Sequence, residues 1–329
     1  MLIIGTNNAD TLTGTTSDDE IRGLDGNDTI VGNAGNDLIY GNQGDDQIDN
    51  AASPAGNGND TIYGGQGNDT IGFGDATGND LIYGNFGNDI VVGGIGNDTI
   101  YGGQGNDFLQ GNVGNDLVYG NLGNDSVQGG DGDDTLYGGQ GNDTFVGGPG
   151  NDVIYGNFGD DLLNRAGPIS GGNDTLYGGQ GNDALLEENG VTGVDRLFGN
   201  LGADTFDFAN GLSQPPSGQT QATADHIADF SDAQGDRVAV FPTGGTKIDF
   251  TEIQGDATVV SVETAITFAN NHSLFGSPNN FNVVFVAGQT DGYLLVDADN
   301  NHTFGGANDY AIVLDHLNST TLFGLQDLI

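Results

Sequence analysis

The heptapeptide YGGQGND at residues 101–107 occurs four times in the chain and belongs to a longer pattern that decides the fold. In a nine-residue frame the pattern reads Gly-Gly-x-Gly-Asn-Asp-x-U-x, where U is apolar, and it can be laid down twenty-one times between Gly5 and Asp207. Position six is Asp in every copy, and position eight is Leu, Ile, Val or Phe in every copy. A pattern held in so many consecutive copies indicates a stack of similar units.

Each nine-residue repeat combines a turn with a short strand. Its first six residues are turn formers, because Gly accepts positive φ and because Asn and Asp tolerate left-handed backbone geometry. Its last three residues, such as TIY at 99–101, favour β-structure and place one apolar side chain on one side. We therefore predict an all-β fold, a right-handed parallel β-roll (a β-solenoid) with two repeats in each 18-residue turn. Its thin core would be filled by position eight.

Two further features predict that successive loops lie on opposite edges of the roll. Extra residues precede only the repeats that begin at Ala55, Asp75, Ile169 and Gly190, and all four are even-numbered repeats. Insertions on one edge would lengthen loops without breaking the strand ladder. Position nine of the even-numbered repeats is aromatic from the fourth repeat onward, which predicts one aromatic row along one face: Tyr40, Tyr63, Tyr83, Tyr101, Tyr119, Tyr137, Tyr155, Tyr177 and Phe198.

The composition changes after Asp207, and we place the domain boundary there. Residues 1–207 are expected to form the roll, and residues 208–329 a small C-terminal β domain that caps it. Residues 225–230 and 235–240 are predicted to be two short strands, and residues 281–317 a three-stranded meander with Gly and Asx turns. Such a cap would cover the open end of the roll, where unpaired strand edges invite aggregation.

The charge of the chain favours cations as partners. It has 47 Asp and Glu against 5 Lys and Arg, a formal net charge of −42, and all but five of the acids are Asp. This charge argues against nucleic acid and anionic membrane surfaces. No Cys occurs and no His lies in the repeats, which disfavours zinc and copper. Carbonyls freed by glycine-rich loops, together with carboxylates, suit Ca²⁺ better than Mg²⁺.

Two loops one turn apart would supply a calcium site together, each giving its position-six Asp and several carbonyls, so the roll could hold at most about 19 ions. The strongest candidate ligands are Asp28, Asp37, Asp46, Asp60, Asp69, Asp80, Asp89, Asp98, Asp107, Asp116, Asp125, Asp134, Asp143, Asp152, Asp161, Asp174, Asp183 and Asp204. We expect weak or empty sites at Asp10, Asp19 and Asp195, whose loops are less regular. Asp297 and Asp299 in DADNN have calcium-loop spacing, but the Gly and Glu of an EF-hand loop do not follow them, so a solvated turn is the alternative.

The repeats resemble those of the RTX (repeats-in-toxin) family of type I secreted bacterial proteins, whose nonapeptide is a calcium-binding β-helix unit. The resemblance implies a calcium-filled parallel β-roll in which the position-six Asp is a side-chain ligand and loop carbonyls surround the ion. The tail resembles the C-terminal segment of the same family, which caps the roll and carries the uncleaved secretion signal. The matching pieces are DHIADF, GDRV, DADNN, DYAIVLDHL and LFGLQDLI.

No catalytic motif is present. The histidines at 226, 272, 302 and 316 form no H-E-x-x-H motif, and the chain has no G-x-S-x-G elbow. The repeats begin at Gly5 and the segment MLIIGTNNAD lacks signal-peptide features, so we expect neither an N-terminal catalytic domain nor a cleaved leader. No apolar run is long enough to span a membrane.

We therefore expect a secreted, non-enzymatic calcium-binding protein at the bacterial surface or in the extracellular matrix, with Ca²⁺ as its cofactor. Without Ca²⁺, the negative charge and the entropy of 61 glycines would keep the chain unfolded for export. The alternative is a carrier or stabilising module for an enzyme or toxin on a separate chain. Self-association, or contact with surface or matrix components, stays open. Ice binding is disfavoured, because neither position three nor position seven gives a continuous row of Thr.

Overall fold

The structure is a computed structural model of the 329-residue chain. It describes residues 1–49, 58–72, 77–164, 172–188 and 193–210, with the tail segments 225–227, 237–239, 248–254, 281–287, 292–297 and 310–314. Throughout these residues the regular secondary structure is β-strand alone. Consequently, no helix in the described part of the chain is able to cross a membrane. The chain divides into two compact units, Met1–Leu162 and Leu163–Ile329.

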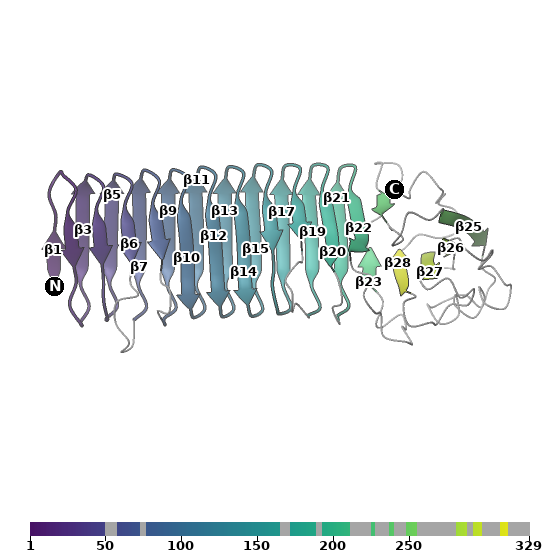
Figure 1. Cartoon of the computed structure of the whole chain (residues 1–329), viewed down its shortest axis with the longest axis horizontal. Coiled ribbons are helices and arrows are strands. Elements are labelled where there is room, and N and C mark those ends of the chain that lie inside the picture. Colours follow the sequence, from purple (N-terminus) through teal and green to yellow (C-terminus); the bar gives the residue numbers. More distant parts are fainter. Residues whose placement is uncertain are drawn as a thin grey trace. The chain divides into compact units, whose positions relative to one another are not determined.

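In the first unit the strands alternate between two parallel sheets (Figure 1). Sheet A contains, in order, β1 (Leu2–Ile4), β3 (Glu20–Asp25), β5 (Leu38–Gln43), β7 (Thr61–Gln66), β9 (Leu81–Phe86), β11 (Thr99–Gln104), β13 (Leu117–Leu122), β15 (Thr135–Gln140) and β17 (Val153–Phe158). Sheet B contains, in order, β2 (Thr11–Thr13), β4 (Thr29–Val31), β6 (Gln47–Asp49), β8 (Thr70–Gly72), β10 (Ile90–Ile95), β12 (Phe108–Val113), β14 (Ser126–Asp131) and β16 (Thr144–Val146). Ile100 pairs with Val118, which confirms the predicted 18-residue turn.

Insertions leave the ladder in register. Leu38 of β5 pairs with Thr61 of β7, and Leu81 of β9 follows Thr61 in the same ladder. Each of the four predicted insertions falls between a sheet B strand and the sheet A strand that follows it in sequence. The added residues therefore lengthen connections of one kind only, as the sequence predicts.

The apolar side chains at position eight form the thin core between the two sheets. These side chains are at most 1% exposed in the first unit: Ile21, Ile30, Ile39, Ile48, Ile62, Ile71, Ile82, Val91, Ile100, Leu109, Val118, Val127, Leu136, Phe145 and Ile154. Leu12, at the same position of the first repeat, is only partly buried because its strand β2 has a sheet neighbour on one side alone. A core this thin depends on stacking of many turns, since one turn cannot bury its own apolar residue.

In most repeats the backbone has positive φ two residues after position nine. Position two has positive φ whether it is Gly or Asn, as in Gly103 (φ 118°) and Asn121 (φ 78°). Gly and Asn are the residues that accept this region most readily, which explains why most repeats have Gly or Asn there.

The predicted aromatic row is present. In the first unit the rings from Tyr40 to Tyr155 are stacked, with neighbouring centroids 4.8–5.1 Å apart and interplanar angles of 2–7°. In the second unit Tyr177 stacks on Phe198 at 4.6 Å. The strand spacing of a parallel ladder, about 4.8 Å, sets this ring separation.

The second unit contains the last repeats and the tail. Its strands are β18 (Leu162–Asn164, which starts at the last residue of the first unit), β19 (Thr175–Gln180), β20 (Ala184–Glu188), β21 (Arg196–Leu201), β22 (Thr205–Asn210), β23 (Asp225–Ile227), β24 (Arg237–Ala239), β25 (Ile248–Gln254), β26 (Phe281–Ala287), β27 (Gly292–Asp297) and β28 (Tyr310–Leu314). Parallel ladders join β19 to β21 and β20 to β22.

The roll pairing continues beyond the last repeat. The predicted short strands are β23 and β24, and they do not form a hairpin together: β23 pairs with β21 and β24 with β22, both in parallel. The predicted meander is β26, β27 and β28, paired antiparallel in that order. It joins the sheet through β28, which pairs with β23. The strand β25 was not predicted. The domain boundary at 207/208 stays a prediction, because the two compact units meet inside the repeats.

Candidate metal centre

The position-six aspartates are buried on both edges of the roll. From Asp19 to Asp204 they are only 1–4% exposed. Each Oδ1 accepts a hydrogen bond from the backbone N–H of the matching Asp one turn earlier, at 2.6–2.9 Å in the first unit. The second unit repeats the bond from Asp174 to Asp195 (2.7 Å) and from Asp183 to Asp204 (2.9 Å). Because partners lie one turn apart, odd and even repeats form two separate aspartate ladders.

The backbone of each Asp is committed as well. The carbonyl of Asp98, for example, accepts the N–H of Leu117 at 2.9 Å. What is left is the second carboxylate oxygen. Within the described part of the first unit, this Oδ2 is buried without a hydrogen-bond partner at Asp28, Asp37, Asp46, Asp69, Asp89, Asp98, Asp107, Asp116, Asp125, Asp134 and Asp143. Buried polar atoms nearly always have a partner, so a row of orphaned oxygens indicates a missing ligand.

Position-one glycines make room beside each orphaned oxygen. A Cβ placed on Gly102 would lie 2.4 Å from Oδ2 of Asp107 and 2.9 Å from the carbonyl oxygen of Gly120. A Cβ on Gly120 would lie 2.3 Å from Oδ2 of Asp125 and 2.7 Å from the carbonyl oxygen of Gly138. A carboxylate oxygen and a carbonyl oxygen from the next turn thus face one small space that any side chain would fill.

The donors around this space fit a hard cation. They are carboxylate and backbone carbonyl oxygens, which are the ligands of Ca²⁺ in proteins. In the residues that the structure describes, no three His, Cys, Asp or Glu side chains gather into a metal cluster.

Burial raises the pKa of these carboxyls, because the ionised form loses its hydration. The pKa rises to about 6 at Asp107 and Asp116 and to about 7 at Asp98. It rises to about 8 at Asp134, where the charges of neighbouring aspartates, first of all Asp152, add to burial. The hydrogen bond from the preceding ladder member lowers each pKa but does not cancel the effect of burial. Without a cation, the carboxyl groups of the aspartate ladders are therefore hard to ionise near neutral pH.

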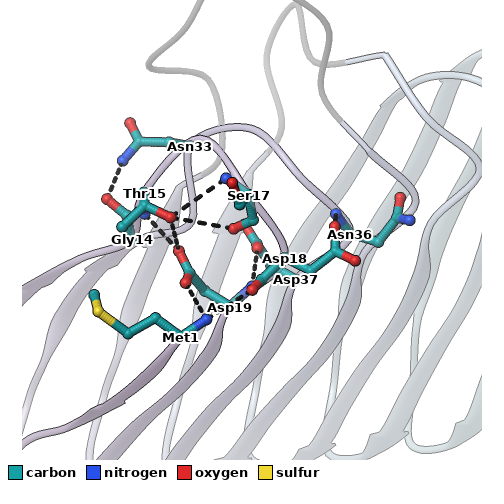
Figure 2. A network of polar contacts seen from close by, with 9 residues as sticks. All are labelled: Met1, Gly14, Thr15, Ser17, Asp18, Asp19, Asn33, Asn36 and Asp37. Atoms are coloured by element: carbon teal, nitrogen blue, oxygen red, sulfur yellow. Dashed lines mark hydrogen bonds and ion pairs between the residues drawn. The ribbon is translucent and has the colours of Figure 1, made fainter.

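The first two repeats are built differently, and Figure 2 shows the contacts of Asp19 in the second. Oδ2 of Asp19 accepts hydrogen bonds from the backbone N–H of Thr15 (2.5 Å) and from its hydroxyl (2.9 Å), and Oδ1 accepts one from the amino group of Met1 (2.6 Å). Burial would raise the pKa of Asp19, but these hydrogen bonds hold it below its usual value. Thr6 donates to Oδ2 of Asp10 in the same way. Both carboxylates already have protein donors. That these sites are weak or empty stays a prediction.

The side chains at position five form a second ladder, whose hydrogen bonds run in the opposite direction along the roll. Oδ1 of Asn97 accepts from the backbone N–H of Asn115 (2.9 Å), and Oδ1 of Asn79 accepts from that of Asn97 (2.9 Å). Here the acceptor lies one turn before the donor, whereas in the aspartate ladder it lies one turn after. These exposed side chains therefore join neighbouring turns at the rim of each loop. From the sequence these residues are predicted only to be turn formers, although their spacing equals that of the aspartates.

The remaining predicted ligands divide into two groups. The aspartates at 60, 80, 152, 161, 174, 183, 195 and 204 are as buried as their neighbours. Asp297 is the last residue of β27, but its side chain and all of Asp299 lie outside the described residues. The position-one glycines were missed as part of the site, because a glycine in a turn carries no signal that separates flexibility from close packing.

The family model of the RTX calcium-binding nonapeptide repeat (4 copies) matches residues 4–38, 22–52, 55–77, 75–100, 92–127, 110–145, 137–165, 170–186 and 189–211. These matches cover more than half of the chain. The chain belongs to the RTX calcium-binding nonapeptide repeat family. RTX nonapeptide repeats bind calcium in general. No curated protein matches the chain significantly.

Proposed function

We propose that this RTX protein is exported from the cell, folds on Ca²⁺ outside it and acts without catalysis as a structural element of the cell surface or matrix. The observation that carries the proposal is the row of buried, partnerless Oδ2 atoms beside position-one glycines. RTX repeat proteins are typically exported by type I systems, which supports an extracellular location.

The position-six aspartates would hold the ions, with carbonyls of the loops around them. The regular ladders from Asp28 to Asp204 are the proposed ligands, and about 19 ions are the upper limit for the roll. Bound calcium would supply positive charge between turns whose carboxylates otherwise repel one another. The chain's own contribution is to bury the carboxylates, aim one oxygen of each at the glycine-lined space and exclude side chains from it.

The same arrangement supports a folding switch. A buried carboxylate without a partner costs several kcal/mol unless it is neutralised, and the ladders repeat that cost along the roll. Binding energy would therefore become folding energy. Extracellular calcium modules bind at about 10⁻⁴–10⁻³ M, so the chain would stay unfolded at cytosolic calcium and fold after export.

Circular dichroism of the full chain during a Ca²⁺ titration tests the switch. We expect an unfolded chain in excess EGTA and a cooperative gain of β-structure in the submillimolar to millimolar range. Calorimetry in the same buffer would give the number of ions bound. A chain that is fully β-rich in EGTA at neutral pH would contradict the proposal, and magnesium at the same concentration serves as the control cation.

A carrier role for a protein on another chain is the second candidate. The observation that favours it is a group of exposed apolar residues on sheet B, where Ile90, Ile95 and Val113 are 47%, 42% and 45% exposed. Pull-down in Ca²⁺ separates the two roles. Retention on cell surfaces or matrix supports the structural role, whereas one enzyme recovered in stoichiometric amount supports the carrier role.

A further inference from the structure

A shallow groove of about 610 Å³ runs along the outer face of sheet A, across five successive strands from β9 to β17. Its first wall includes the stacked position-nine tyrosines Tyr83 and Tyr101, and its floor is position two of each repeat. Its second wall is position three, which reads Phe86, Gln104, Leu122, Gln140 and Phe158 along the roll. We call this the tyrosine groove. It lies away from the aspartate ladders, because positions nine, two and three face outward while position six is buried.

We propose that the tyrosine groove binds an extended, uncharged, β-linked polysaccharide with one sugar per turn of the roll. The proposal goes beyond the proposed function, since it names a partner for the folded roll and depends only on the roll being folded.

The lining has the chemistry that recognises sugar rings. The apolar wall residues are well exposed: Phe86 by 50%, Leu122 by 40% and Phe158 by 51%. They can cover the C–H faces of pyranose rings, as apolar and aromatic pocket walls generally do for ligands. Within the described residues, the side-chain amides of Gln104 and Gln140 make no hydrogen bond, and they alternate with the apolar residues. Free amides supply both donors and acceptors for hydroxyl groups.

The groove is periodic in the way that such a polymer is. The stacked tyrosines repeat every turn at 4.8–4.9 Å, which is close to the length of one extended pyranose unit. The chemistry of the wall repeats every second turn, because Phe86, Leu122 and Phe158 are each 36 residues apart. Successive sugars of an extended β-linked chain are turned over relative to one another, so that chain also repeats every second unit. One register therefore places equivalent sugars on equivalent side chains.

The uncharged lining favours a neutral occupant. No acidic or basic side chain lines the groove, although the chain as a whole is rich in Asp. A polyanion or a polycation would find no charged side chain there to pair with. A peptide cannot add as an extra strand here, because β11, β13 and β15 already pair on both sides. A neutral polymer is the occupant that fits this lining.

The Asn side chains on the floor of the groove are hydrogen-bonded to the strand backbone. Nδ2 of Asn85 donates to the carbonyl of Tyr83 (3.2 Å), and Nδ2 of Asn121 donates to that of Tyr119 (3.3 Å). The alternate floor positions are Gly103 and Gly139, which have no side chain. The floor therefore has no side chain at every second turn, beside Gln. At the turns between, beside Phe or Leu, it has a hydrogen-bonded Asn.

Isothermal titration calorimetry of the full chain in saturating CaCl₂ tests the proposal with cellohexaose and mannohexaose as ligands. Maltohexaose, which is α-linked and coils, is the control sugar. We expect binding of at least one extended hexasaccharide and none of maltohexaose. Phe86→Ala and Phe158→Ala should each weaken binding roughly three- to tenfold, as expected when a single aromatic contact is lost.

The matched control variants are Ile95→Ala and Val113→Ala. These residues occupy the same position three with similar exposure, 42% and 45%, but on sheet B. They should leave binding unchanged. Absence of heat with both extended sugars, or equal loss in both sets of variants, would overturn the proposal. So would sedimentation showing a dimer in Ca²⁺ that Phe86→Ala abolishes, because the groove would then be a contact between copies. Circular dichroism of each sample separates these outcomes from a failure of calcium-dependent folding.

Discussion

The backbone N–H of Asp98 donates to Oδ1 of Asp116, one turn further along the roll, at 2.7 Å. Each Asp in the ladder thereby uses one carboxylate oxygen to hold the preceding turn, while the other oxygen faces the glycine-lined space between turns. Structural cohesion and the candidate metal site share a single side chain.

Replacing Asp116 by Asn tests the roles of its two carboxylate oxygens separately. The amide oxygen can still accept from Asp98, but Oδ2 becomes a neutral NH₂ group that cannot ligate a cation. We expect the calcium-loaded protein to lose on the order of 1–3 kcal/mol of unfolding free energy, as for a buried polar group that loses its partner. In EGTA the variant should instead be more stable than the parent, because a buried charge has been removed. Urea unfolding followed by circular dichroism measures both.

Asp131→Asn is the matched control for this charge change. Asp131 is an exposed position-three residue of β14. If Asp131→Asn shifts the calcium requirement as much as Asp116→Asn does, net charge rather than the ladder controls folding.

Stability should depend on pH with opposite signs in the presence and absence of calcium. In EGTA, the ladder pKa values of about 6 to 8 lie above the ordinary value of 3.8, so the folded roll binds more protons than the unfolded chain. Its stability therefore falls as pH rises from about 4 to 8, and its β-content should grow on acidification. In saturating calcium the reverse is expected, since protons compete with Ca²⁺ for the same oxygens. Circular dichroism at several pH values checks both directions; a flat profile in EGTA contradicts the first.

Filling the space beside Oδ2 should weaken calcium-dependent folding. In Gly102→Ala the new methyl would lie 2.4 Å from Oδ2 of Asp107, and backbone shifts of this kind cost about 1–3 kcal/mol. We expect a higher calcium midpoint in a titration followed by circular dichroism. Gly72→Ala is the control, because a Cβ at Gly72 meets nothing within 4 Å. Equal midpoints for the two variants would mean that the glycine-lined space is not used.

The tyrosine row should contribute to stability through ring stacking rather than through its hydroxyls. Tyr119 stacks on Tyr101 and on Tyr137 at 4.8 Å each. Tyr119→Leu should lower the unfolding free energy in calcium by about 1–3 kcal/mol, since two aromatic pairs are lost. Tyr119→Phe keeps both stacks and should stay within about 0.5 kcal/mol of the parent. Urea denaturation compares the three proteins, and a large loss in Tyr119→Phe would instead point to the hydroxyl.

In the tail, the sequence predicts local hairpins but not the pairing of distant strands. The meander of β26, β27 and β28 could be predicted, because apolar runs separated by turn residues define hairpins locally. The pairing of β23 with β21 and of β24 with β22 could not, since a short strand carries no mark of its partner. Nothing in the repeat pattern indicated that parallel pairing continues past Asp207.

The sequence by itself determined the 18-residue turn, the inward position eight, the single-edge insertions and the aromatic row. Each of these features follows from the repeat length, which can be read from any few neighbouring repeats of the sequence. Only the tertiary structure decided what lies between turns: the orphaned oxygen beside Gly102, the opposed ladders of Asn97 and Asp98, and the groove between Tyr101 and Gln104. The two ladders join atoms 18 residues apart, and the other two features gather atoms from neighbouring turns, so their geometry exists only once the turns are stacked.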